Sequence, residues 1–127
     1  MATTEKKESS TVLFIDDDPL IRNLSSEYLA SNGLSVITAA NGLEGLRIYQ
    51  DRCEEISLVV LDLVMPQMSG RDCWLRLREI DPQVRVLVTT GGSLNKELRI
   101  CLKEGVLGYL TKPFRPSQLL DRLRENL

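Results

Sequence analysis

Three segments of the chain carry apolar side chains in consecutive positions, and these runs constrain the fold more than any other feature. They are TVLFID at 11–16, LVVLD at 58–62 and VRVLVTT at 84–90. A strand with one exposed face alternates apolar and polar residues, whereas a strand buried on both faces is apolar throughout. The runs therefore indicate a parallel sheet that is covered by helices on both sides.

Two further strands and five helices complete the pattern. The strands are LSVITA at 34–39 and VLGYLT at 106–111. The first helix is expected from Pro19 to Ser31, with Asp18 as its N-cap. The second helix is expected to open at Asn41, and the third to run from Ser69 to the Asp81-Pro82 pair. The fourth is expected to end at Gly105, and the fifth to open at Pro116.

Alternating strands and helices with right-handed crossovers leave few topologies. We predict an α/β fold of the flavodoxin-like type, a three-layer (βα)5 sandwich with a five-stranded parallel sheet in the order 2-1-3-4-5. The chain has 127 residues, which suggests one domain at 11–127 after a flexible polar tail at 1–10. Ligands of such sheets bind beyond the carboxyl ends of the strands.

Composition excludes several classes of function. The chain contains no histidine, which removes a Ser-His-Asp triad, a histidine-ligated metal and a phosphohistidine within the chain. A net charge of −2 gives no support for nucleic-acid binding, and no apolar run is long enough for a membrane span. Three widely spaced cysteines and no signal peptide favour reduced thiols and a cytoplasmic location.

The polar residues that follow the strands should meet at one edge of the sheet. Asp16 and Asp17 follow the first strand, Asp62 ends the third, Thr89-Thr90 end the fourth and Lys112 follows the fifth. Each pair of carboxylates at close range would cost about 3–4 kcal/mol. This repulsion is relieved if one carboxyl group keeps its proton, or if a divalent cation binds the cluster. Oxygen ligands without nitrogen or sulfur suit magnesium.

Four motifs, in this order and spacing, resemble the receiver domain of two-component response regulators. They are VLFIDDDP, LVVLDLVMPQMSG, VLVTTGG and GYLTKPF. The likeness runs from about Val12 to Leu127. It implies that Asp62 accepts a phosphoryl group from a histidine kinase or a histidine phosphotransfer protein.

The resemblance also implies a metal site and a switch. Mg²⁺, for which Mn²⁺ could substitute, would be held by Asp17 and Asp62, by Asp16 through water and by the backbone carbonyl of Val64. Lys112 would pair with the phosphoryl group, with Pro113 fixing its approach through a cis bond. Thr90, chosen over Thr89 because Gly91 follows it, would move to the phosphoryl oxygen, and Tyr109 would then turn inward. The responsive surface would be formed by the fourth helix, the fifth strand and the fifth helix. The same surface could serve as a dimer interface.

Two other functions compete with a signalling phosphoacceptor, which is not an enzyme in the usual sense. A phosphatase of the haloacid dehalogenase type would use Asp16 and Asp18 as its acidic pair with Lys112 downstream, but it leaves Asp62 without a role. A receiver-like binding module that is never phosphorylated should have lost Asp62, Thr90 or Lys112, and all three are present.

Overall fold

The computed structural model describes residues 10–92 and 95–127, which form five parallel strands and five helices. In chain order the elements are β1 (Thr11–Ile15), α2 (Pro19–Ser31), β2 (Ser35–Ala39), α3 (Gly42–Arg52), β3 (Ile56–Asp62), α4 (Gly70–Ile80), β4 (Val86–Thr90), α5 (Lys96–Glu104), β5 (Gly108–Thr111) and α6 (Pro116–Asn126). The strand order is β2-β1-β3-β4-β5, and every pair is parallel. The predicted fold class and strand order are confirmed.

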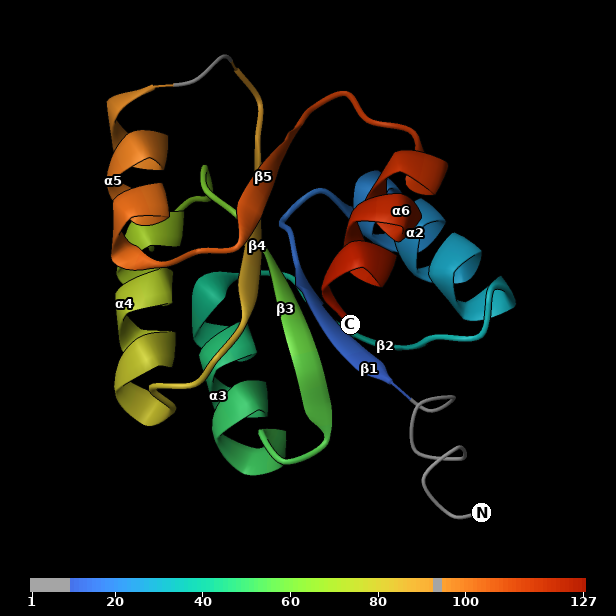
Figure 1. Cartoon of the computed structure of the whole chain (residues 1–127), viewed down its shortest axis with the longest axis horizontal. Helices are drawn as coiled ribbons and strands as arrows, with labels where there is room; N and C mark the ends of the chain where they lie inside the picture. Colours follow the sequence, from blue (N-terminus) through green and yellow to red (C-terminus); the bar gives the residue numbers. More distant parts are fainter. Residues whose placement is uncertain (1–9, 93–94) are drawn as a thin grey trace.

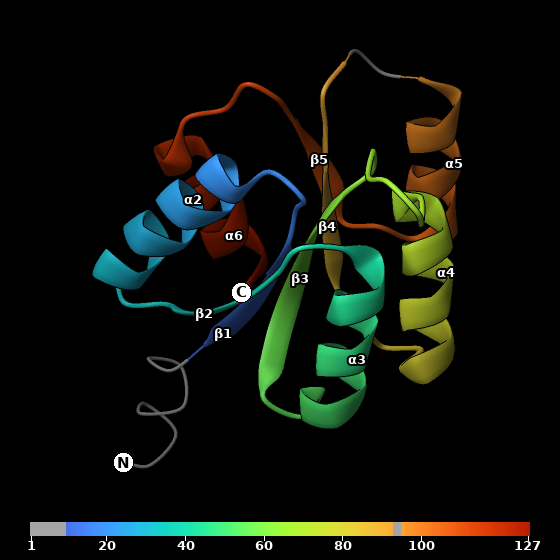
Figure 2. The same cartoon turned by 180° about the vertical axis from the view of Figure 1, so that it is seen from behind.

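Helices cover both faces of the sheet (Figure 1). α3, α4 and α5 pack on one face, while α2 and α6 pack on the other, as the view from behind also shows (Figure 2). Each face has its own apolar core, one including Trp74 and Leu77 and the other including Phe14 and Leu119. β1, β3 and β4 lie between these two layers, which is why their residues are apolar in consecutive positions. No helix within the described ranges is long and apolar enough to span a bilayer.

Most helix boundaries follow the predicted caps. Asp18 accepts a hydrogen bond from the Leu20 N–H, and Ser69 accepts one from the Asp72 N–H. Asn41 accepts from the Glu44 N–H, while the Glu44 carboxylate reaches Ala40. The last helix ends at Asn126, so Leu127 lies outside it as a half-exposed terminal residue.

Strand boundaries were predicted less well. β4 begins at Val86 rather than residue 84, because the Val84 N–H donates to Asp81 and closes a turn. β5 begins at Gly108 rather than residue 106, because the Val106 N–H is used by the C-terminal end of α5. β1 and β2 each lose one predicted end residue, and β3 starts two residues early.

The tail predicted at 1–10 lies outside the described residues except for Ser10. The Ser10 carbonyl accepts a hydrogen bond from the Ser35 N–H, which extends the β1–β2 pairing by one contact.

Candidate functional site

A hollow of about 370 Å³ lies at the carboxyl edge of the sheet. Its lining includes the last residues of β3 and β4, Asp62 and Thr90, and residues just after β1 and β5, Asp17 and Lys112. These residues are far apart in the sequence, and the parallel sheet brings them together because its strands all end at this edge. The predicted convergence of these polar residues is confirmed.

Lys112 connects two buried carboxylates. Its Nζ donates a hydrogen bond to Asp62 Oδ2 at 3.0 Å and lies 2.9 Å from Asp16 Oδ2 as an ion pair. The Asp62 side chain is 3% exposed and that of Asp16 is 1% exposed. One ammonium therefore balances part of the negative charge that would otherwise make this cluster unstable.

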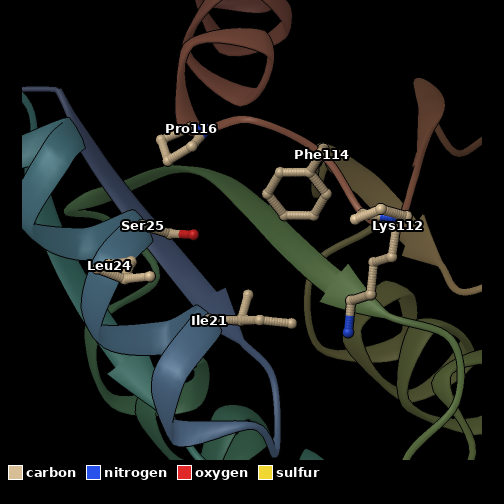
Figure 3. Close-up of a pocket in the computed structure, with 7 residues that line it drawn as sticks. Ile21, Leu24, Ser25, Lys112, Phe114 and Pro116 are labelled. Carbon is tan, nitrogen blue, oxygen red and sulfur yellow. The ribbon is translucent and has the colours of Figure 1, made fainter.

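Lys112 also borders a second pocket outside the hollow. Lys112, Pro113, Phe114 and Ile21 line a neighbouring apolar pocket between α2 and the loop that precedes α6 (Figure 3). The Lys112-Pro113 peptide bond is cis, as predicted.

The carboxylates are arranged so that a cation could bind them. Asp16, Asp17 and Asp62 each place one oxygen within 4.8 Å of the others. Asp16 Oδ2 is buried and lies 2.9 Å from the Lys112 ammonium. Asp17 is exposed to the hollow. Three hard oxygen donors so close together fit a magnesium ion.

Backbone contacts position the acidic loops. The Val64 N–H donates to Asp62 Oδ1 at 3.1 Å, and the Asp18 N–H donates to Asp16 Oδ1 at 2.8 Å. The Arg22 guanidinium donates to the Asp16 carbonyl at 2.8 Å, a contact that we did not predict from the sequence. The only sequence feature that pointed to this contact was the position of Arg22 in the first turns of the predicted helix.

The two threonines at the end of β4 have different surroundings. Thr90 lines the hollow, whereas the Thr89 hydroxyl is buried and forms no hydrogen bond with the described residues. Adjacent residues of a strand point to opposite faces. The structure therefore places Thr90 at the site, where the resemblance put it. Tyr109 is half-buried beside the core under α4 and α5, and its carbonyl accepts a hydrogen bond from Arg122.

Burial dominates the electrostatics of Asp62. It raises the pKa of Asp62, and this effect exceeds the opposing contribution of Lys112. For Lys112, burial alone would lower the pKa, but the two adjacent carboxylates raise it overall. The lysine is therefore charged at neutral pH, while the ionised form of Asp62 is disfavoured by its surroundings.

No cysteine is among the described residues that line the hollow. Burial raises the pKa of Cys73 to about 12 and that of Cys101 to about 11. Both thiols are buried under helices on the α4 and α5 side of the sheet. Thiol chemistry is therefore not expected at this edge of the sheet.

Replacing Asp62 with asparagine is expected to stabilise the metal-free protein at about pH 7. The raised pKa means that the folded state loses stability as pH rises from the ordinary carboxyl value through the value in the fold. The amide of the Asp62→Asn variant carries no charge and avoids this cost. Urea unfolding should show a more stable variant near neutrality and a shrinking difference toward about pH 3. A less stable variant at neutral pH would refute this assignment of the electrostatics.

Comparison with known proteins agrees with this geometry. The family model for the response regulator receiver domain matches residues 12–124. Sensor kinase CckA of Brucella abortus is 32% identical over 124 residues, which cover 98% of this chain and 13% of that protein. Transcriptional regulatory protein GlrR of Escherichia coli is 32% identical over 116 residues, covering 91% of this chain and 26% of that protein.

Other relatives are of similar length to this chain. Chemotaxis protein CheY of Halobacterium salinarum is 29% identical, with 91% of this chain and 95% of that protein covered. A solved receiver domain from Clostridium thermocellum superposes with a TM-score of 0.86 at 32% identity, covering 92% of this chain and 93% of the other. CheY4 of Vibrio cholerae gives 0.86 at 30% identity, with 94% and 99% covered.

The family match spans nearly the whole sheet and every loop that lines the hollow. The chain belongs to the response regulator receiver domains of two-component signalling systems.

Proposed function

We propose that Asp62 accepts a phosphoryl group from a histidine kinase or a histidine phosphotransfer protein in a Mg²⁺-dependent reaction. The observation that carries this proposal is that Asp62 lies 3.0 Å from the Lys112 ammonium and shares with Asp16 and Asp17 a group of carboxylate oxygens within 4.8 Å of one another. Burying a carboxylate at the end of an apolar strand is costly. The cost is explained if Asp62 is a nucleophile, because its reaction needs the lysine ammonium and a metal ion beside it.

The metal would be held by Asp17 and Asp62, with Asp16 acting through water and Val64 contributing its backbone carbonyl. When bound, Mg²⁺, or Mn²⁺ in its place, supplies positive charge that offsets the charge of the transferring group. Asp16 Oδ2 lies 2.9 Å from the Lys112 ammonium, and a carboxylate has further lone pairs that could accept a hydrogen bond from a metal-bound water.

The chemistry requires positioning more than proton transfer. A carboxylate oxygen of Asp62 forms a bond to phosphorus as the bond between phosphorus and the donor's histidine nitrogen breaks. The electron pair of the broken bond stays on that nitrogen. The Lys112 ammonium, now 3.0 Å from Asp62 Oδ2, would then pair with a phosphoryl oxygen as well.

The acyl phosphate would be read through Thr90 and Tyr109. Thr90 lines the same hollow as Asp62, so its hydroxyl can donate to a phosphoryl oxygen after a local shift. Tyr109 lies on β5, where it pairs with Val88 of β4, and would fill the space that is vacated. The responsive surface would be formed by α5, β5 and α6, and phosphorylation would shift its population rather than create a new fold.

The phosphatase alternative is not favoured by the geometry. Asp18 borders the hollow, but its carboxylate accepts a hydrogen bond from the Leu20 N–H and caps α2, so the second acid that this mechanism needs is already engaged. Acetyl phosphate with Mg²⁺ separates the three functions. A phosphoacceptor takes up one phosphoryl group per chain, a phosphatase turns over many phosphate esters, and a pure binding module does neither.

The phosphodonor must approach the rim of the hollow, and apolar side chains lie beside it. Leu20 and Leu24 on α2 are 65% and 53% exposed, and Leu24 borders the pocket that Lys112 lines. Exposed leucines next to a reaction site suit contact with an amphipathic helix.

Leu24→Glu is therefore expected to slow phosphotransfer from the protein donor by about tenfold, the loss typical of a truncated interface anchor. Its rate with acetyl phosphate should not change. Leu43→Glu is a matched control, because Leu43 is 50% exposed but lies on α3, across the sheet. Equal rates for both variants with the protein donor would contradict this docking surface.

A further inference from the structure

Glu104, the last residue of α5, is the meeting point of three side chains from α4. Trp74 Nε1 donates to its carboxylate at 3.1 Å, and Arg71 forms an ion pair with the same carboxylate at 2.5 Å. Arg78 donates to the Glu104 backbone carbonyl at 2.7 Å and lies 5.1 Å from the centre of the Trp74 ring. Directional contacts therefore fix the C-terminal end of α5 to α4.

The other end of α5 is attached differently. Asn95 caps the helix by accepting from the Leu98 N–H, and Leu98 is fully buried. Among the described residues, no side chain from 95 to 100 forms a hydrogen bond or an ion pair with a residue outside this helix. Apolar contact is non-directional, so this end can shift at lower cost than the Glu104 end. It is also the end that follows Thr90 in the chain.

We propose that Glu104 is the pivot of the switch: α5 turns about its C-terminal end, which Glu104 keeps fixed to α4, when Thr90 moves toward a phosphoryl group. This inference rests on the proposed roles of Asp62 and Thr90. Displacement would be largest near Lys96 and Glu97 and smallest at Glu104. The partner-facing change would then be concentrated on the N-terminal half of α5.

The alternative is a latch, in which the Glu104 contacts break on phosphorylation. The two mechanisms differ at Trp74, the only tryptophan of the chain. Its indole N–H gives a single side-chain peak in a proton–nitrogen NMR spectrum, and that peak reports the hydrogen bond to Glu104 directly.

The experiment records this spectrum for the whole chain before and after addition of Mg²⁺ and beryllofluoride, a phosphoryl mimic. We expect amide peaks of residues 96–99 to move, while the indole peak moves much less than it does in ligand-free Glu104→Ala, which has no side-chain acceptor for the indole N–H. An indole displacement as large as that of Glu104→Ala would show a latch and overturn the pivot. If peaks near Asp62 and Thr90 also stay in place, the proposed function itself fails, and the pivot with it.

Variants test whether the anchor matters for the response. In Glu104→Gln, and in Arg71→Gln, which removes the same ion pair from α4, the ligand-induced movement of 96–99 should fall about twofold or more. Beryllofluoride affinity should change less, because neither residue lines the hollow. Glu55→Gln is the matched control, since it breaks the exposed Arg52–Glu55 ion pair, which does not join α4 and α5. Responses identical to Glu55→Gln in both variants would overturn the proposal.

Discussion

Gly70→Ala should lower the free energy of unfolding by about 3 kcal/mol and slow phosphorylation of Asp62. A Cβ at this position would overlap Leu63 Cα and lie 2.6 Å from the Asp62 carbonyl oxygen. Both are backbone atoms that no side-chain rotation can move away. The Gly70 N–H also donates to the Leu63 carbonyl at 2.9 Å, so the loop that carries Asp62 closes on this glycine.

Urea unfolding and the rate with acetyl phosphate measure the two parts of this prediction. Gly108→Ala is the control for stability, because its Cβ would meet Leu87 Cδ1 only at 3.7 Å, an ordinary contact. If Gly70→Ala unfolds at the same urea concentration as the wild type, the close approach of α4 to the Asp62 backbone is incorrect.

Lys112→Met is expected to have an even larger effect. It leaves the Asp16 and Asp62 carboxylates buried and facing each other without a counter-charge, and removal of one partner of a buried pair costs about 3–5 kcal/mol. The loss should be greatest at neutral pH and smaller in acid, where protonated carboxyl groups need no counter-charge. The rate of phosphorylation should fall about 10²–10³-fold, as for other lost charge-stabilising groups.

Lys112→Arg, which keeps the positive charge, separates the two effects. It should recover most of the stability but less of the rate, because the bulkier guanidinium cannot occupy the same point beside Asp62 Oδ2. Unfolding curves at neutral pH that are identical for Lys112→Met and the wild type would show that the lysine does not stabilise this cluster.

The parts of the fold that were predicted correctly depend on repeating patterns. Consecutive apolar residues indicated which strands are covered on both faces, and Leu13 and Val59 are indeed fully buried there. Because parallel strands end at one edge, placing Asp62 and Lys112 on strand ends was enough to bring them together. The choice of Thr90 over Thr89 came instead from the resemblance, because Gly91 follows Thr90, and Thr90 is the threonine that lines the hollow.

The parts that were not predicted depend on contacts between distant residues. Val84 and Val106 have the composition of strand residues, but hydrogen bonds to Asp81 and Cys101 draw them into turns. Leu24 has the helical spacing of a core residue and is nevertheless half exposed. The contact between Trp74 and Glu104 joins α4 to α5 through two residues that are 30 positions apart, and no local sequence pattern marks it.

The central claim is that one oxygen of Asp62 accepts phosphorus. The most direct test is to incubate the protein with acetyl phosphate and Mg²⁺, trap the acyl phosphate by borohydride reduction and locate the modified residue by peptide mass spectrometry. We predict a single modification on the peptide that contains Asp62, absent without Mg²⁺ and absent in Asp62→Asn. Modification at Asp16, Asp17 or Asp18 with Asp62 intact, or undiminished labelling of Asp62→Asn, would contradict the account.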